Sequence, residues 1–329
     1  GSNPLDCPKP RKLRACLARF GADATEYGTR AAMDDLDAVR AALGYAQLDI
    51  YGTSYGATAA QVYLERHRHS VRTLTLDGAT FLDVPFYSRF ARNAQRALAQ
   101  LAGRCAASPA CARVFPHWTA TLARLIRAWN AHPVHRTRTA TMTGDQLAGV
   151  VQTMLLDPES AAEIPLVVAR AAAGDYGPLD QQTEPGVSSP QLMFWSIWCN
   201  EPWVGLGAKG PWHTLFDGYT TRTIAAYRQA CSSLPKRTEP AAAWTRPTRT
   251  DVPLLVLAGG ADPQDPVGNL PGLRRTFPNA RTIVVPGYGH TVGQYGCLGG
   301  IVANFIDDGS AGLDTRCVKA IALPPFVLH

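Results

Sequence analysis

Residues Gly52–Gly56 read Gly-Thr-Ser-Tyr-Gly and match the G-x-S-x-G pattern of a nucleophile elbow. In such an elbow the serine lies on a strained turn between a strand and a helix, and the glycines let those elements approach closely. The apolar run Leu48–Tyr51 precedes the motif and the alanine-rich run Ala57–Arg66 follows it. The alternative is a glycine-flanked turn whose serine faces solvent. The context favours Ser54 as the nucleophile of an acyl transfer.

Asp262 and His290 are the residues that could activate this serine. A serine hydroxyl is a weak nucleophile without a base, and sheet-based hydrolases supply the acid and the base later in the chain, in the order Ser, Asp, His. Asp262 follows the expected strand Leu254–Ala258, and His290 follows the next expected strand, Arg281–Val285. The carboxyl ends of parallel strands meet in one crevice. Both side chains could therefore reach Ser54.

Two further aspartates compete for roles near this crevice. Asp265 is the rival acid, because it lies only three residues after Asp262. We prefer Asp262 because it comes first after a Gly-Gly turn and precedes Pro263, whose ring fixes the loop. Asp77 also ends an expected strand, and we expect it to brace a loop or to line the pocket.

The elements around these residues alternate as in a parallel α/β sheet. Helical spacing over 27–43 is followed by a strand over 48–51, a helix over 57–66 and a strand over 71–77. Residues 81–246 instead show amphipathic helical patterns, which are clearest at 91–101, 118–129, 143–156 and 160–173. Strand signals return at 252–259. We therefore expect a discontinuous α/β core of residues 1–80 and 247–329, with a helical cap of residues 81–246.

Eight cysteines occur in local couples, and none forms a Cys-x-x-Cys pair, so zinc and thioredoxin-type sites are not indicated. Pairing between neighbours closes short loops and loses the least entropy. The alternative is a set of buried free thiols. We favour disulfides, which form in oxidising compartments, and therefore expect a secreted or periplasmic protein. The expected pairs are Cys7–Cys16, Cys105–Cys111, Cys199–Cys231 and Cys297–Cys317.

Composition excludes several classes of protein. Hydrophobic residues make up 46% and charged residues 18% of the 329 residues, which excludes a disordered chain. No apolar run is long enough for a transmembrane helix. The net charge is +6, but the basic residues are scattered and never form a run of four, so nucleic-acid binding is not indicated. We expect no metal and no cofactor.

Several segments together resemble one family, the secreted α/β-hydrolases of the tripeptidyl-aminopeptidase and proline-iminopeptidase-like group. The resemblance implies an α/β-hydrolase parallel sheet, a helical cap over the site, and a catalytic triad of Ser54, Asp262 and His290. It also implies that the backbone N–H of Tyr55 forms half of the oxyanion hole. The segments that carry it are Ser2–Cys7, Tyr51–Gly56, Leu76–Gly78, Asp262–Pro266, Gly287–Thr291 and the pair Cys297 and Cys317.

The resemblance also exposes a difference at the N-terminus. Members of the group carry further residues before the point where this chain begins, and these residues build the first strands and a Gly-rich oxyanion loop. The run Gly-Gly-Pro-Gly does not occur in the sequence, which begins Gly1-Ser2 without a methionine. We expect the first strands and this loop to lie outside the chain. A separate N-terminal polypeptide that completes the fold, a fragment, and a deviating architecture remain open.

Substrate choice depends on the cap. An aminopeptidase must bind a free N-terminal ammonium, which requires a carboxylate near the pocket. The segment Trp198–Glu201 is the strongest candidate, because a disulfide at Cys199 would hold Glu201 in place. Trp198 and Asn200 would then contact the substrate, and the tryptophans would wall an apolar pocket. The alternative is that Glu201 is a surface acid and the tryptophans belong to the cap core.

Three functions remain open on the sequence. The first is a serine aminopeptidase that releases short peptides or single residues from a free N-terminus. The second is a carboxylesterase that acts on small acyl esters with the same triad. The third is a catalytically silent binding protein or fragment with the hydrolase fold. A serine-directed probe separates the third from the other two, and blocking the substrate's amine separates the first from the second.

Overall fold

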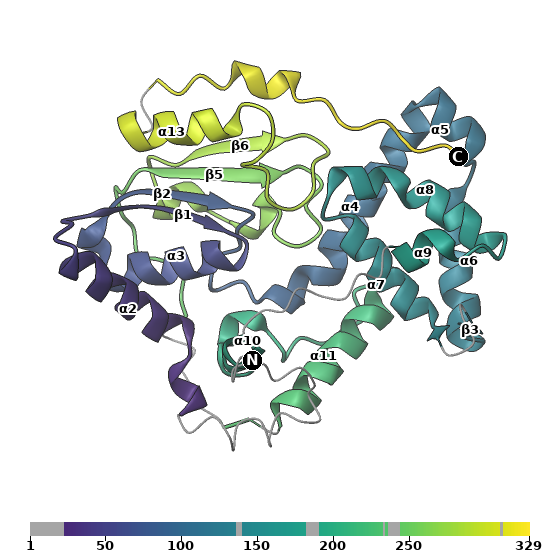
Figure 1. Cartoon of the computed structure of the whole chain (residues 1–329), viewed down its shortest axis with the longest axis horizontal. Coiled ribbons are helices and arrows are strands. Elements are labelled where there is room, and N and C mark those ends of the chain that lie inside the picture. The colour runs from purple at the N-terminus through teal and green to yellow at the C-terminus, as the bar shows by residue number, and fades with distance from the viewer. Residues whose placement is uncertain (1–22, 136–139, 182–190, 233, 236–243, 310–311) are drawn as a thin grey trace, which may run out of the picture.

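A four-stranded parallel sheet lies at the centre of the α/β part (Figure 1). In this computed structural model, the described residues are 23–135, 140–181, 191–232, 234–235, 244–309 and 312–329. The strands lie side by side in the order β1-β2-β5-β6, and every neighbouring pair is parallel. Their bounds are β1 Leu48–Thr53, β2 Val71–Asp77, β5 Leu254–Gly259 and β6 Arg281–Val285.

Helices cover both faces of this sheet (Figure 1). Strand β5 is buried along its whole length, and its side chains alternate between two hydrophobic clusters. Leu254 and Val256 pack in one cluster with α3, whereas Leu255 and Leu257 pack in the other with α13. A strand buried on both faces is a near-continuous apolar run, and β5 lies within the strand predicted at 252–259. The helices of this part are α2 Thr29–Ala42, α3 Tyr55–Arg66, α12 Leu273–Thr276 and α13 Leu298–Asp308.

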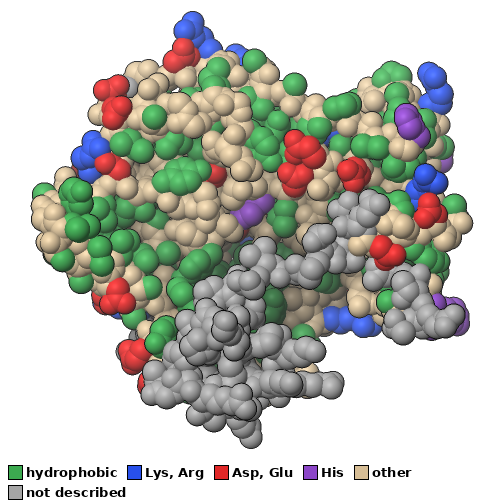
Figure 2. Space-filling view, viewed as in Figure 1, with side chains coloured by type: hydrophobic (Ala, Val, Ile, Leu, Met, Phe, Trp, Pro, Cys, Tyr) green, Lys and Arg blue, Asp and Glu red, His purple; other side chains and the backbone are tan. Residues whose placement is uncertain are grey.

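Strand β1 forms one edge of the described sheet, since it pairs there with β2 alone. Tyr51 on this strand is 43% exposed, and Val39 and Leu43 on or beside α2 are more exposed still. Hydrophobic side chains therefore gather on the surface over α2 and β1 (Figure 2).

The segment between β2 and β5 is mainly helical and shares one large hydrophobic cluster. Its helices are α4 Phe86–Ala107, α5 Pro109–Val114, α6 Trp118–Ala131, α7 Gly144–Met154, α8 Pro158–Ala172, α9 Gly177–Gln181, α10 Gln191–Asn200 and α11 Asp217–Cys231. A small antiparallel pair, β3 Val134–His135 and β4 Thr141–Met142, accompanies them. Short 3₁₀ helices lie at η2 Ala24–Glu26, η3 Arg68–Ser70, η4 Pro202–Val204, η6 Val267–Asn269 and η7 Arg316–Ala320.

The predicted helices of this segment correspond to α4, α6, α7 and α8, whereas α10 and α11 were not predicted. Helix α12 has only four residues. Helix α8 begins where the sequence predicts a break, because Asp157 caps it by accepting a hydrogen bond from the Ser160 N–H at 2.9 Å and Pro158 occupies its first turn.

Three of the four expected disulfides are present: Cys105–Cys111, Cys199–Cys231 and Cys297–Cys317. The expected pair of Cys7 and Cys16 lies outside the described residues. The Cys199–Cys231 bond joins the end of α10 to the end of α11. Across the described ranges, no helix is both long and apolar enough to span a membrane.

Candidate active site

Ser54 lies at the turn between β1 and α3, where the G-x-S-x-G pattern predicts it. Its φ of 53° and ψ of −121° are strained for a residue with a side chain. A Cβ at Gly52 would lie 2.4 Å from the carbonyl oxygen of Gly56, so the close approach of strand and helix requires a glycine at 52. A Cβ at Gly56 would meet no atom within 4 Å. The expectation that both glycines serve the close approach is therefore wrong for Gly56.

The structure brings Ser54, His290 and Asp262 into one hydrogen-bonded line. The Oγ atom of Ser54 lies 2.8 Å from Nε2 of His290, and Nδ1 of His290 lies 2.9 Å from Oδ2 of Asp262. The other carboxylate oxygen of Asp262 accepts from the N–H groups of Gln264 and Asp265, at 2.8 and 2.9 Å. Asp262 is completely buried, so its orientation is fixed by these bonds.

The loop that carries His290 is held by a turn between α7 and α8. The N–H of His290 donates to the carbonyl oxygen of Leu156 at 2.7 Å. A Cβ at Gly289 would lie 2.3 Å from that same oxygen, and a Cβ at Gly259 would lie 1.8 Å from the carbonyl oxygen of Gly289. The end of β5, the histidine loop and the α7–α8 turn are thus in direct backbone contact.

Asp77 braces the other side of the same loop. Its carboxylate accepts from the N–H groups of Val292 and Gly293, each at 2.8 Å, and from the Tyr51 hydroxyl at 2.8 Å. Of the two roles that the sequence left open for Asp77, the loop brace agrees with these contacts. It is not among the residues that line the cavity at Ser54.

Three carboxylates surround the imidazole of His290. Burial disfavours its charged form, but Asp262 above all, and then Asp265 and Asp77, outweigh burial and raise the pKa of His290 to about 9. Burial also raises the pKa of Asp265 to about 6, although His290 opposes that shift. Arg96 is a further charged group nearby, and it donates to the backbone carbonyl of Asp262 at 3.3 Å.

Tyr55 supplies a backbone donor beside the serine. It is the first residue of α3, where N–H groups have no partner within the helix. In the described part of the chain, the N–H of Tyr55 donates to no acceptor. Its side chain turns away to Thr29, with 2.8 Å between the two hydroxyl oxygens. The backbone of Tyr55 could therefore bind an oxyanion.

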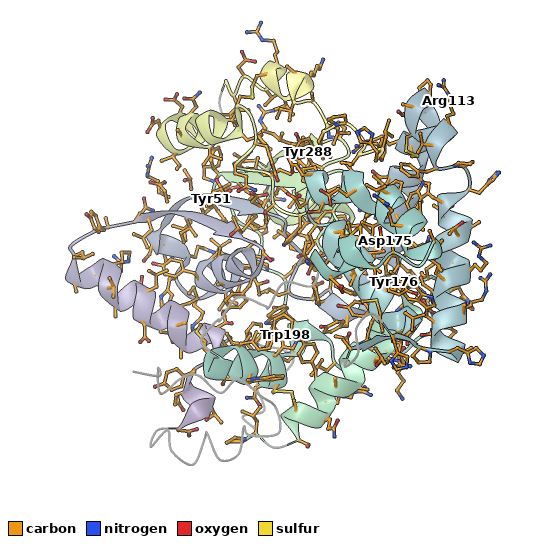
Figure 3. The ribbon with its side chains drawn as sticks, turned by 45° about the vertical axis from the view of Figure 1, so that its right-hand side comes forward. Tyr51, Arg113, Asp175, Tyr176, Trp198 and Tyr288 are labelled. Carbon is orange, nitrogen blue, oxygen red and sulfur yellow. A yellow bond between two sulfur atoms is a disulfide. The ribbon has the colours of Figure 1, made fainter. Side chains whose placement is uncertain are left out.

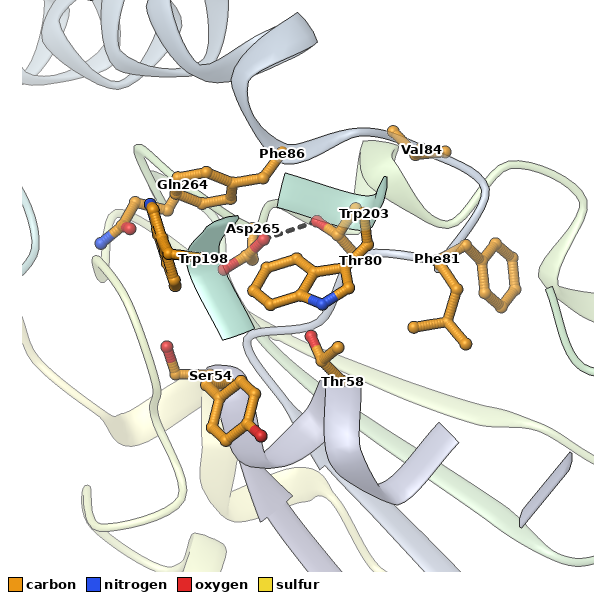
Figure 4. A pocket seen from close by; sticks show the side chains of 12 residues that line it. Ser54, Thr58, Thr80, Phe81, Val84, Phe86, Trp198, Trp203, Gln264 and Asp265 are labelled. Atoms are coloured by element: carbon orange, nitrogen blue, oxygen red, sulfur yellow. Dashed lines mark hydrogen bonds between the residues drawn. The ribbon is translucent and has the colours of Figure 1, made fainter. Parts of the chain in front are cut away.

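A cavity opens at Ser54, and Figure 4 shows the side chains around it. Its walls are mostly apolar. Among the described residues that line it, Asp265 is the only carboxylate, and none is a lysine, arginine or histidine. The aromatic walls come from the segment between β2 and β5 and comprise Phe86, Trp198 and Trp203. Trp198 lies on the side of α10 that faces the sheet (Figure 3).

Glu201 and Asn200 line a different, more polar cavity. The carboxylate of Glu201 is only 6% exposed. Its Oε1 accepts from the Thr29 N–H at 2.6 Å, and its Oε2 accepts from the Thr29 hydroxyl at 2.8 Å and from the Trp203 indole N–H at 2.6 Å. The expected substrate cluster is therefore divided: Trp198 faces the cavity at Ser54, whereas Glu201 and Asn200 do not line it.

Sequence reasoning missed two residues of this region. Thr80 lies just beyond β2, at the carboxyl edge of the sheet, and its hydroxyl donates to Oδ1 of Asp265 at 2.5 Å. Its position after a strand was a usable signal. Thr29 gave no comparable signal, because it contacts Glu201 across 172 residues of sequence. In the described residues, no group of three or more His, Cys, Asp or Glu side chains is arranged to hold a metal ion.

Residues 2–293 match the family model described as alpha/beta hydrolase fold. The chain belongs to this family. The putative hydrolase YuaR of Escherichia coli K12 is 31% identical over 107 residues, which cover 31% of this chain and 21% of that protein. The match thus spans about a fifth of the length of that curated relative.

Two solved structures illustrate the more distant likenesses. Proline iminopeptidase of Mycobacterium smegmatis aligns over 89% of this chain and 76% of its own, with 17% identity and a TM-score of 0.39. An epoxide hydrolase of Bacillus megaterium aligns over 87% of this chain and 78% of its own, with 14% identity and a TM-score of 0.39.

Proposed function

We propose that this alpha/beta hydrolase is a serine aminopeptidase, which cleaves short peptides from a free N-terminus through an acyl-enzyme on Ser54. The observation that carries the proposal is the hydrogen-bonded line from Asp262 through His290 to the Ser54 hydroxyl, with distances of 2.9 and 2.8 Å. Nucleophile, base and orienting acid stand in this order in triad chemistry.

The first half of the reaction forms the acyl-enzyme. The Oγ of Ser54 attacks the scissile carbonyl carbon while its proton passes to Nε2 of His290. The C–N bond then breaks, and the leaving amine takes that proton from His290. Asp262 keeps the imidazole in the tautomer with hydrogen on Nδ1 and stabilises the imidazolium. In the second half, a water gives a proton to Nε2 of His290 and attacks the acyl carbon. The bond between the acyl carbon and Oγ of Ser54 then breaks, and Oγ takes the proton back from His290.

The N–H of Tyr55 is the proposed donor to the tetrahedral oxyanion. It lies one residue from the nucleophile at the positive end of α3, and it has no acceptor among the described residues. Loss of one oxyanion donor typically costs about 10²–10³ in kcat.

The insert between β2 and β5 acts in this proposal as a cap that selects the substrate. Phe86, Trp198 and Trp203 all belong to it and wall the cavity at Ser54. Asp265, the only carboxylate among the described residues that line that cavity, supports a substrate with a free amine. The apolar walls alone would equally accept a small acyl group, and this observation keeps the carboxylesterase as the second candidate. The disulfides support a secreted or periplasmic location.

The test of the hydrolase itself is labelling with a fluorophosphonate probe. The unmodified protein is expected to be labelled at Ser54 and Ser54→Ala to remain unlabelled. Ser70→Ala, at the opposite end of β2 from the site, is the matched control and is expected to label fully. Absence of labelling in the unmodified protein would leave the silent binding protein in place of the enzyme.

The test of the aminopeptidase uses an aminoacyl anilide, its N-acetylated form and a short acyl phenyl ester. We expect the free anilide to be cleaved and the acetylated one to be nearly inert. Equal rates for the two anilides, together with rapid ester cleavage, would replace the aminopeptidase by the esterase.

A further inference from the structure

Asp265 has one carboxylate oxygen that the chain leaves open towards the cavity at Ser54. The residue is 8% exposed and lies on the loop after β5. Its Oδ1 accepts the hydrogen bond from Thr80, drawn in Figure 4. Its Oδ2 accepts no hydrogen bond in the described residues, and it lies 4.0 Å from Nε2 of His290, the same nitrogen that binds the Ser54 hydroxyl.

A buried carboxylate in such surroundings lacks a strong partner. Charged groups buried without pairing are costly, and native structures normally pair them. The other described residues that line the cavity are aromatic, aliphatic, hydroxyl or amide and carry no positive charge. The cation nearest to the open oxygen is protonated His290, at 4.0 Å, and Asp262 already binds its other ring nitrogen. A cationic group of the substrate would supply the missing partner.

We propose that Asp265 binds the α-ammonium group of the very residue whose carbonyl Ser54 attacks, so that the enzyme releases one N-terminal residue at a time. This inference rests on the aminopeptidase proposed above. Within one residue the α-nitrogen and the carbonyl carbon are separated by about 2.5 Å. The open oxygen of Asp265 lies 4.0 Å from Nε2 of His290, and the Oγ of Ser54 lies 2.8 Å from that same nitrogen. The ammonium and the carbonyl carbon of one residue would therefore lie on either side of a single ring nitrogen.

A longer released peptide does not fit this arrangement. Each additional residue moves the ammonium outward by about 3.3–3.6 Å in an extended chain. A tripeptide would therefore carry its ammonium about 7 Å farther from the carbonyl carbon than a single residue does, beyond a carboxylate that adjoins the nucleophile.

The same charge acts against substrates without an amine. An ionised carboxylate beside Ser54 repels the negative charge that develops on the carbonyl oxygen, unless a cation neutralises it. Asp265, together with Asp262 and Asp77, also raises the pKa of His290 and so favours its protonated form. Arg96, which donates to the backbone carbonyl of Asp262, is a further cation nearby. An ammonium bound at Asp265 cancels one of these negative charges and so favours the neutral imidazole that the first step needs.

The experiment compares Asp265→Asn with Glu201→Gln, each of which removes one carboxylate charge at constant volume. The substrates are an aminoacyl anilide with a free amine and a short acyl phenyl ester. We expect Asp265→Asn to lower the anilide-to-ester ratio of kcat/KM by about 30-fold or more, as for loss of a buried charge partner. Glu201→Gln is expected to leave this ratio unchanged, because Glu201 lies at another cavity.

Two additional measurements guard against a purely structural effect. Asp265→Glu keeps the charge and is expected to recover part of the ratio. With the ester, which carries no ionisable amine, the acid limb of kcat/KM near pH 9 should move to lower pH in Asp265→Asn, because one cause of the raised pKa of His290 is gone. Stoichiometric labelling by the fluorophosphonate probe establishes that each variant is folded at the site.

The possible outcomes distinguish failure of the proposed ammonium site at Asp265 from failure of the proposed aminopeptidase activity. If free anilides remain preferred over acetylated ones but Asp265→Asn leaves the ratio unchanged, the aminopeptidase stands and Asp265 is not its ammonium site. A fall of the ratio in Glu201→Gln alone moves the site to Glu201. Faster cleavage of a tripeptidyl anilide than of an aminoacyl anilide overturns single-residue release. If the unmodified protein does not distinguish free from acetylated anilides, the aminopeptidase itself fails.

Discussion

Asp265 and Glu201 are both buried carboxylates next to tryptophans of the segment between β2 and β5, yet their surroundings differ. Both oxygens of Glu201 accept hydrogen bonds from Thr29 or Trp203. Only one oxygen of Asp265 accepts one in the described residues, and the other faces the cavity at Ser54. A carboxylate whose oxygens bind the chain's own donors holds elements together, whereas one with an open oxygen near Ser54 is available to a ligand in that cavity.

The position of Glu201 explains what it holds together. Thr29 is the first residue of α2, and its hydroxyl also contacts that of Tyr55, the first residue of α3. Trp203 belongs to η4, directly after α10. Glu201 therefore connects the segment after α10 to the first residue of α2 and, through Thr29, to the first residue of α3.

Ser54→Ala tests the assignment of Ser54 as the nucleophile, on which the roles proposed for Asp265 and Glu201 both depend. Because the members of a triad act as a unit, loss of the nucleophile should lower kcat by about 10⁶ for anilide and ester alike. His290→Ala should cost nearly as much. Steady-state rates in preparations checked for contaminating hydrolases measure this, and residual activity above a few per cent would contradict the assignment of Ser54.

Asp262→Asn tests whether the two aspartates of one loop have different functions. Loss of the acid that orients the base should lower kcat by about 10⁴ for every substrate. Asp265→Asn should instead act selectively on substrates with a free amine. Parallel kinetics of the two variants on anilide and ester decide between them. If Asp265→Asn proved the more damaging change with the ester, Asp265 would be the triad acid.

Removing the Cys199–Cys231 bond tests the rigid support of Glu201. The bond closes a loop with a sequence separation of 32, and the double Cys→Ser variant should lose about 3–4 kcal/mol of unfolding free energy by loop-closure estimates. Denaturant unfolding under non-reducing conditions measures this loss. The Cys105–Cys111 bond, with a sequence separation of only 6, is the control, and its removal should cost less unfolding free energy. An equal loss in both variants would contradict the loop-closure argument.

Glu201→Gln tests the structural side of the comparison. The change leaves donors of Thr29 and Trp203 without a charged acceptor, so we expect a loss of about 1.5–3 kcal/mol in unfolding free energy. Chemical denaturation gives this quantity. An unchanged stability, combined with a selective loss of anilide cleavage, would reverse the roles that we assign to Glu201 and Asp265.

The residues of the hydrogen-bonded line could be located from the sequence because each lies at the end of a recognisable strand. Ser54 follows β1, Asp262 follows β5 and His290 follows β6, and a parallel sheet brings such ends to one edge. The local sequence pattern around each residue was therefore enough to predict that the three side chains lie close together. The helix–strand alternation likewise predicted the parallel sheet.

The direction of Asp265 and the partners of Glu201 could not be found in this way. Asp265 points into the cavity because its own N–H is tied to Asp262 and its carboxylate to Thr80, which no spacing reveals. Helix α10 escaped prediction because its sequence, QLMFWSIWCN, is apolar on nearly every side and has no amphipathic period.

The backbone hydrogen bond between His290 and Leu156 has a consequence for motion. Since the His290 N–H donates at 2.7 Å to the turn between α7 and α8, that turn cannot swing outward without releasing the amide. Exchange of this amide with solvent deuterium therefore reports how often the turn opens. If opening of the turn limits turnover, the exchange rate of this one amide and kcat should change in parallel with temperature.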